Sequence, residues 1–151
     1  YDEIAALGYL QGSAVGEIVG YGTALEIRLP GIDKHPVLDT VDYLFDLHTM
    51  QHYAPPLMMS GRHAKAKTLA ARIGVPERVV GDAGHAAGKR MRDYGGFDDP
   101  ASPKTALLIE CGQHWEADAA DVAKDCTVEF LRVSGVMAPE FGDMAWAFLD
   151  M

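Results

Sequence analysis

Hydrophobic and polar positions along the chain follow two different periods, and each period predicts a type of element. Residues 23–29 and 41–47 alternate with the period of two that is typical of strands. In the second segment one face carries the apolar side chains of Val41, Tyr43, Phe45 and Leu47. Leu44 adds an apolar residue to the other face. We therefore predict a buried strand that ends at His48.

The next segments predict a helix and two more strands. Apolar residues recur at helical spacing over residues 64–73, and Gly74 and Pro76 follow as stop signals. Residues 79–80 form a short strand that precedes a glycine-rich loop. Residues 105–110 are a nearly continuous apolar run, which is typical of a central strand covered on both faces.

Three further helices are expected, two of them in the last third of the chain and one at its N-terminal end. Residues 116–134 carry an apolar stripe, with acidic residues in the first turns and Gly135 after the last turn, as the helix dipole and C-cap favour. Residues 140–149 predict a further helix. Residues 2–7 begin a helix that the following glycines interrupt.

Strands that alternate with helices predict an α/β fold with a mixed, mostly parallel sheet flanked by helices. We assign this domain to residues 37–151, and residues 1–36 form an N-terminal segment of unassigned structure. The chain begins without Met and stops at Met151 inside an amphipathic pattern, so we expect a truncated domain from a longer protein.

Composition narrows the class of protein. The chain has 151 residues, of which 48% are hydrophobic and 23% charged, as in one globular domain. Its longest purely apolar run is Ala-Leu-Leu-Ile, too short for a membrane span. The net charge of -9 disfavours nucleic acid as a partner. Two cysteines and the lack of a signal peptide suit the cytoplasm. A truncated domain exposes apolar surface, which favours a homo-oligomer.

Asp46 and His48 form the first candidate chemical group. An imidazole at the end of a rigid strand is a good metal ligand, and Asp46, on the same strand face, is placed to hold its second ring nitrogen. The alternative is a structural histidine bonded to the backbone.

Glu110 ends the predicted central strand and is the second candidate. Burial raises the pKa of a carboxyl, as a general base requires, and a water beside a metal is a suitable proton donor. The alternative is a structural ion pair with an arginine at the sheet edge. Cys111 offers a different chemistry, as a thiolate nucleophile with His114 or His85 as base.

Basic side chains in loops are candidates for binding a substrate carboxylate. Residues 81–90 form a glycine-rich loop that holds His85 and Arg90, although an ordinary surface turn has the same composition. Arg62 follows a Ser-Gly turn and could hold a carboxylate through two hydrogen bonds. The predicted substrate-binding residues are Arg62, His85, Arg90 and His114.

The order of these motifs resembles the succinylglutamate desuccinylase/aspartoacylase family, whose members are zinc hydrolases related to the zinc carboxypeptidases. The resemblance extends over about residues 37–136. The motifs that carry it are Asp46-Leu47-His48-Thr49-Met50, Gly84-His85, Asp93-Tyr94-Gly95, Glu110-Cys111-Gly112-Gln113-His114-Trp115 and Gly135-Val136.

The resemblance implies the zinc carboxypeptidase fold, one zinc ion held in part by His48, and Glu110 as the general base. The implied reaction is hydrolysis of an N-acyl amide or ester bond of a small carboxylate-bearing substrate. The chain departs from the family upstream, because no His-x-x-Glu motif precedes the Asp-Leu-His strand. The alternative is therefore a non-catalytic α/β scaffold or a fragment without a complete metal site.

Overall fold

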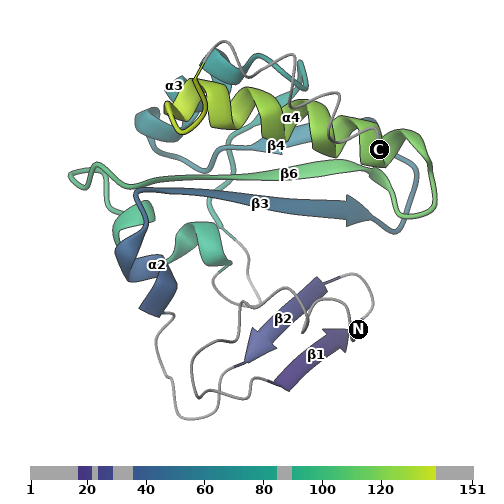
Figure 1. Cartoon of the computed structure of the whole chain (residues 1–151), viewed down its shortest axis with the longest axis horizontal. Coiled ribbons are helices and arrows are strands. Elements are labelled where there is room, and N and C mark those ends of the chain that lie inside the picture. Colours follow the sequence, from purple (N-terminus) through teal and green to yellow (C-terminus); the bar gives the residue numbers. More distant parts are fainter. Residues whose placement is uncertain (1–16, 22–23, 29–35, 85–89, 139–151) are drawn as a thin grey trace. The chain divides into compact units, whose positions relative to one another are not determined.

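The computed structural model describes residues 17–21, 24–28, 36–84 and 90–138. Contacts divide the chain into two units, Tyr1–Pro36 and Val37–Met151. The first unit contains an antiparallel pair, β1 (Glu17–Tyr21) and β2 (Ala24–Arg28) (Figure 1). β2 confirms the strand predicted at residues 23–29, whereas β1 was not predicted. The helices expected at residues 2–7 and 140–149 lie outside the described residues.

The second unit is built on a mixed sheet of four strands. They are β3 (Tyr43–Met50), β4 (Leu57–Met59), β5 (Val79–Val80) and β6 (Thr105–Gln113), in the order β3-β6-β4-β5. β3 runs parallel to β6 and β4 runs parallel to β5, while β4 is antiparallel to β6. The predicted α/β class with a mixed sheet flanked by helices is therefore confirmed.

Helices cover both faces of this sheet. α3 (Ala64–Ile73) and α4 (Asp118–Ser134) lie over one face, as Figure 1 shows, and pack with the main hydrophobic core. α2 (Pro36–Thr40) and the short 3-10 helices η1 (Met91–Asp93) and η2 (Gly95–Phe97) lie on the other side, where Leu38, Phe97 and Ala106 form a smaller core. Within the described residues, no helix is both long and apolar enough to cross a membrane.

The two long helices follow their sequence signals closely. α3 has the predicted ends, and Gly74 closes it in the left-handed conformation at φ 75°. α4 begins two residues later than predicted and ends at Ser134, with Gly135 at φ 78°. A residue with a β-carbon is strained at such positive φ values, so glycine defines where each helix stops.

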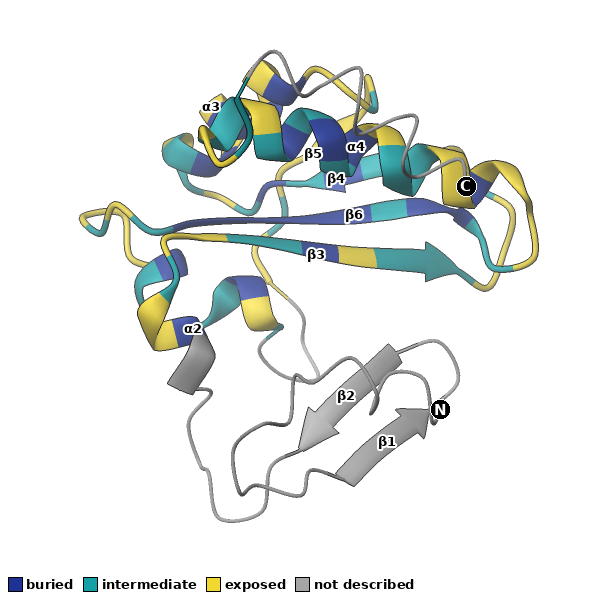
Figure 2. Ribbon diagram, in the orientation of Figure 1, coloured by how far each residue is buried: buried dark blue, intermediate teal, exposed yellow. Residues whose placement is uncertain are grey.

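β6 is the central strand of the unit. Every residue from Thr105 to Ile109 is buried, as the continuous apolar run predicted (Figure 2). The strand extends to Gln113, beyond its predicted end at Glu110.

β3 differs from the prediction of a buried strand. Tyr43 is 40% exposed and Leu47 is 49% exposed, and only Asp46 in β3 is buried (Figure 2). The alternation was predicted correctly, but among the described strands β3 lies at the edge of the sheet, with β6 as its one neighbour. His48 also lies within β3 rather than at its end.

Candidate functional site

Alternation along the strands puts the candidate polar side chains on one face of the sheet. In β6, Leu107, Ile109 and Cys111 belong to the core beneath α3 and α4, so Glu110 points to the opposite face. In β3, Phe45 packs against the same core, and His48 therefore shares the face of Glu110.

His48 and Glu110 are directly opposite each other in the parallel β3–β6 register. Neighbouring strands are separated by about 4.8 Å, so the two side chains are adjacent on the shared face. The His48 Nε2 and Asp46 Oδ1 atoms are 3.0 Å apart, which is the hydrogen bond expected from the sequence. This bond raises the pKa of His48 against the opposing effect of burial, and the negative charges of Asp46 and Glu110 add to the increase.

Glu110 is half-buried, and its Oε2 atom has no hydrogen-bond partner among the described residues. Burial raises the pKa of its carboxyl, and the positive charges of His48 and Arg90 reduce the increase. The alternative of a structural ion pair with an arginine is not observed within the described chain. A half-buried carboxyl with an unpartnered oxygen and a raised pKa is a stronger proton acceptor than an exposed carboxylate.

Arg90 precedes η1. Its Nη1 atom donates to Asp82 Oδ2 at 2.8 Å and lies 3.8 Å from Met59 Sδ. Asp82 also accepts a hydrogen bond from Arg92 Nη2. Burial disfavours the charged form of Asp82, but the hydrogen bonds from the two arginines keep its pKa below the usual value. Arg90 is therefore held in place by Asp82 while its charge acts on Glu110.

His114 lies just beyond β6, at the carboxyl ends of β3 and β6. Its Nδ1 atom is 2.5 Å from Thr49 Oγ1, and its backbone N–H donates to Met50 O at 3.0 Å. Its Nε2 atom is buried and has no hydrogen-bond partner in the described part of the chain. Two buried polar atoms without partners, one on Glu110 and one on His114, thus lie four positions apart along the chain.

The other candidates from the sequence do not join this group. Arg62 lines a pocket that does not include His48 or Glu110, and it donates to Asp98 Oδ2 at 3.3 Å. His85 lies outside the described residues. Cys111 is buried on the opposite face of β6, and burial raises the pKa of its thiol to about 11. The burial of Cys111 and the raised pKa of its thiol disfavour the hypothesis of a Cys111 thiolate nucleophile, which stays untested.

The described residues do not fit a complete zinc site. A catalytic zinc ion takes three protein ligands and a water. Among residues 17–21, 24–28, 36–84 and 90–138, no group of three His, Cys, Asp or Glu side chains could hold a metal ion. His48 is the one ligand that the family resemblance assigns here, and its Nε2 atom is engaged by Asp46. The unpartnered oxygen of Glu110 fits a proton acceptor without a metal.

Sequence reasoning missed the part played by Asp82 and Arg92. Their ion pair joins two segments that are ten positions apart, and the side chain of Arg92 is 2% exposed. The run of basic residues around Arg92 gave no sign of burial, because basic runs are ordinarily solvated. Asp82, inside the glycine-rich loop, and Asp93, directly after Arg92, were the candidate partners in the sequence.

No protein-family model, curated protein or solved structure matches the chain.

Proposed function

We propose that the chain is part of a hydrolase of the deacylase type, which cleaves the N-acyl amide or ester bond of a small carboxylate-bearing substrate. The observation that supports this function most directly is the unpartnered, buried Oε2 atom of Glu110 beside His48. Leaving a carboxylate oxygen buried without a partner is costly, and active sites are a common place for such groups.

In this proposal Glu110 accepts the proton of the attacking water. The water oxygen forms a bond to the acyl carbon, and the bond from that carbon to the leaving nitrogen breaks. Glu110 then transfers the same proton to the leaving nitrogen. The second proton of the water is lost from the new carboxyl group to the amine, so that the products are a carboxylate and a protonated amine. The raised pKa of Glu110 strengthens it as a base relative to an exposed carboxylate.

Two further side chains support this role. Asp46 fixes the ring of His48 through the 3.0 Å hydrogen bond, which keeps an imidazole beside the carboxylate of Glu110. Arg90 uses Nη1 for Asp82, and its remaining N–H groups are the ones we assign to a substrate carboxylate. Because the Asp82 carboxylate holds Arg90 in place, the arginine is preorganised to bind an anion.

Zinc belongs to the proposal through the family resemblance alone, as does the zinc carboxypeptidase fold. His48 is the residue that would contribute to holding the ion. Since the described residues supply no three-ligand group, the catalytic role of Glu110 is argued from its own burial and charge.

The second candidate is a non-catalytic α/β scaffold. The observation in its favour is the lack of a three-ligand metal group among the described residues. In that case the pair of His48 and Glu110 would be a remnant of a reactive site.

Two measurements on the full chain distinguish the candidates. Elemental analysis of protein purified without chelator gives zinc per chain, and a value near one would support the part of the proposal that rests on the family resemblance. A panel of N-acyl amino acids, assayed for released amine with and without added zinc, should include at least one substrate. Zinc near zero together with no hydrolysis under either condition would support the scaffold.

A further inference from the structure

A pocket with a volume of about 270 Å³ lies on the same side of the sheet as η1 and η2. The start of α3, the loop after β5 and the two 3-10 helices surround it, and Ala106 of β6 forms part of its wall. His48, Glu110 and Arg90 do not line it. Ala106 and Glu110 are four positions apart on β6, which is about 13 Å along an extended strand. The pocket is therefore separate from the site around Glu110.

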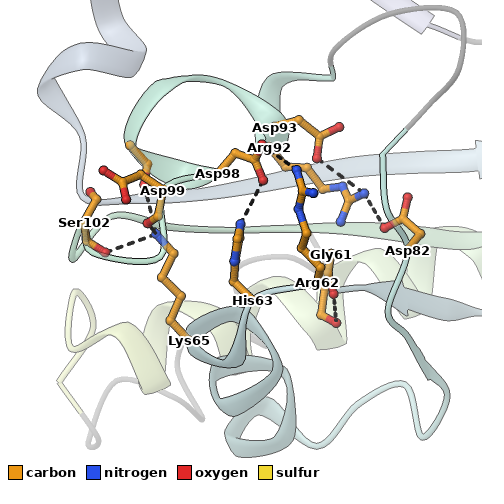
Figure 3. Close-up of polar contacts among 12 residues, drawn as sticks. Gly61, Arg62, His63, Lys65, Asp82, Arg92, Asp93, Asp98, Asp99 and Ser102 are labelled. Carbon is orange, nitrogen blue, oxygen red and sulfur yellow. Dashed lines mark hydrogen bonds and ion pairs between the residues drawn. The ribbon is translucent and has the colours of Figure 1, made fainter.

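Arg92 is the most unusual residue in the wall of this pocket. Its side chain is 2% exposed, and its Nη2 atom pairs with Asp82 and with Asp93 Oδ1, the latter at 3.5 Å (Figure 3). Its Nε atom is buried and has no hydrogen-bond partner in the described residues. A guanidinium N–H without an acceptor is costly when it is buried, so an acceptor supplied by a ligand would stabilise this arrangement.

Gly61 allows the backbone to come close to Arg92. Its φ is +67°, and a β-carbon added at this position would lie 3.0 Å from Arg92 Nη1. The chain then passes through Arg62 and His63 directly into α3, which has 10 residues. This turn therefore brings the start of a helix to the same pocket as a buried guanidinium.

The N-terminus of α3 adds backbone donors to the pocket wall. The side chain of its N-cap residue, His63, makes no capping hydrogen bond, and the first turn contains no acidic residue. His63, which precedes the helix, uses its Nε2 atom for Asp98 Oδ1 at 3.0 Å instead (Figure 3). The first N–H groups of a helix have no partner within the helix, and together with the helix dipole they favour an anion.

The carboxylates in the wall are already engaged. Asp82 pairs with Arg90 and Arg92, Asp93 pairs with Arg92, and Asp98 pairs with Arg62 and His63. Within the wall, these three aspartates pair with Arg62, Arg92 and His63, and Arg90 from outside the wall adds a second partner for Asp82. The Nε atom of Arg92 and the first turn of α3 remain as donors in excess.

We infer that this pocket binds a small oxyanion, either a carboxylate or a phosphoryl group. The ligand accepts hydrogen bonds from Arg92 Nε and from the first backbone N–H groups of α3. The small volume of the pocket fits a single anionic group or a compact metabolite, rather than a macromolecule.

The test is isothermal titration calorimetry of the full chain with inorganic phosphate and, separately, with acetate, at constant ionic strength. We expect saturable binding of at least one probe with a Kd of about 1 mM or tighter. Tighter binding of phosphate would identify a phosphoryl ligand, and tighter binding of acetate a carboxylate. Saturable binding of neither probe would overturn the inference.

Two variants of α3 with the same change of net charge locate the site. Ala64→Asp places a carboxylate at the exposed first position of the helix, where it competes for the free N–H groups and favours the helix itself. It should weaken binding by about tenfold, whereas Thr68→Asp, exposed further along α3, should change the Kd by less than about twofold. Equal effects of the two variants would contradict a site at the start of α3.

Two further variants test the guanidinium and the separation of the sites. Arg92→Lys keeps the charge beside Asp82 but removes the Nε donor, and should weaken binding by about tenfold. Glu110→Gln should leave the Kd unchanged, because Glu110 does not line the pocket. A loss of binding in Glu110→Gln would overturn the claim of a second site, whatever the outcome for hydrolysis.

Discussion

Glu110 lies directly across from His48 on the neighbouring parallel strand, and one oxygen of its carboxylate has no hydrogen-bond partner in the described chain. The sheet therefore holds a buried acceptor beside an imidazole on the face that carries η1 and Arg90. Such an arrangement is unfavourable for folding, and this cost leads to the first prediction.

Glu110→Gln should increase the free energy of unfolding at neutral pH by about 1 kcal/mol, because it removes a half-buried charge that lacks a full set of partners. The folded-state pKa of Glu110 is raised above 4.5, so wild-type stability falls as the pH rises through the raised pKa. The gain in the variant should accordingly be smallest below pH 4.5. Thermal unfolding at several pH values measures it, with Glu116→Gln, which alters an exposed side chain, as the control.

Asp46→Asn should lower the pKa of His48, because the hydrogen bond to Asp46 is the main cause of the increase. The pKa of His48 is raised above 6.5 in the folded chain, so its contribution to stability is complete below pH 6.5 and is lost as the pH rises through the raised value. NMR titration of the imidazole measures the pKa, with the His52 resonance as internal reference. An unchanged pKa of His48 in Asp46→Asn would show that the pair does not form in solution.

Asp82→Asn should reduce the free energy of unfolding by about 3 kcal/mol, because it leaves the buried guanidinium of Arg92 without its closest carboxylate. Denaturant unfolding measures the loss. Asp121→Asn is the matched control, since Asp121 is 74% exposed and pairs with Lys124 on the surface of α4. That variant should differ from wild type by less than about 0.5 kcal/mol, and equal losses would rule out a structural role for the Asp82–Arg92 pair.

Lys65→Met should destabilise the segment that carries Asp98. The Lys65 ammonium lies within hydrogen-bond distance, 2.6–3.1 Å, of four backbone carbonyls, those of Gly96, Asp99, Ser102 and Lys104, which share its three N–H donors. Figure 3 shows the side chain of Lys65 reaching from α3 toward this segment. We expect a loss of about 2 kcal/mol in denaturant unfolding, because the carbonyls lose a charged donor. The exposed Lys67→Met is the control, and a similar loss in both variants would contradict the contacts.

Elements with strong local signals were predicted well from the sequence. The ends of α3 follow from Gly74 and the helical period, and the burial of β6 follows from its apolar run. The exposure of β3 depends on its place in the strand order. The alternation of apolar and polar residues along β3 does not encode that place. β4 was missed because Leu57–Met59 is too short to show a period.

For the candidate site, the sequence indicated the residues but not their register. Asp46 and His48 are two positions apart, so their shared strand face could be predicted. The pairing of His48 with Glu110 depends on how β3 and β6 align, over a separation of 62 positions. The contacts of Arg92 with Asp82 and of His63 with Asp98 also join distant segments, and no local pattern specifies them.

The most direct test of the proposed function is the turnover of an N-acyl amino acid substrate by the chain and by Glu110→Gln, with Glu116→Gln as the control. If Glu110 carries the proton, kcat should fall by about 100-fold or more in Glu110→Gln and remain unchanged in the control. Equal turnover by the wild-type chain and a folded Glu110→Gln variant would contradict the account.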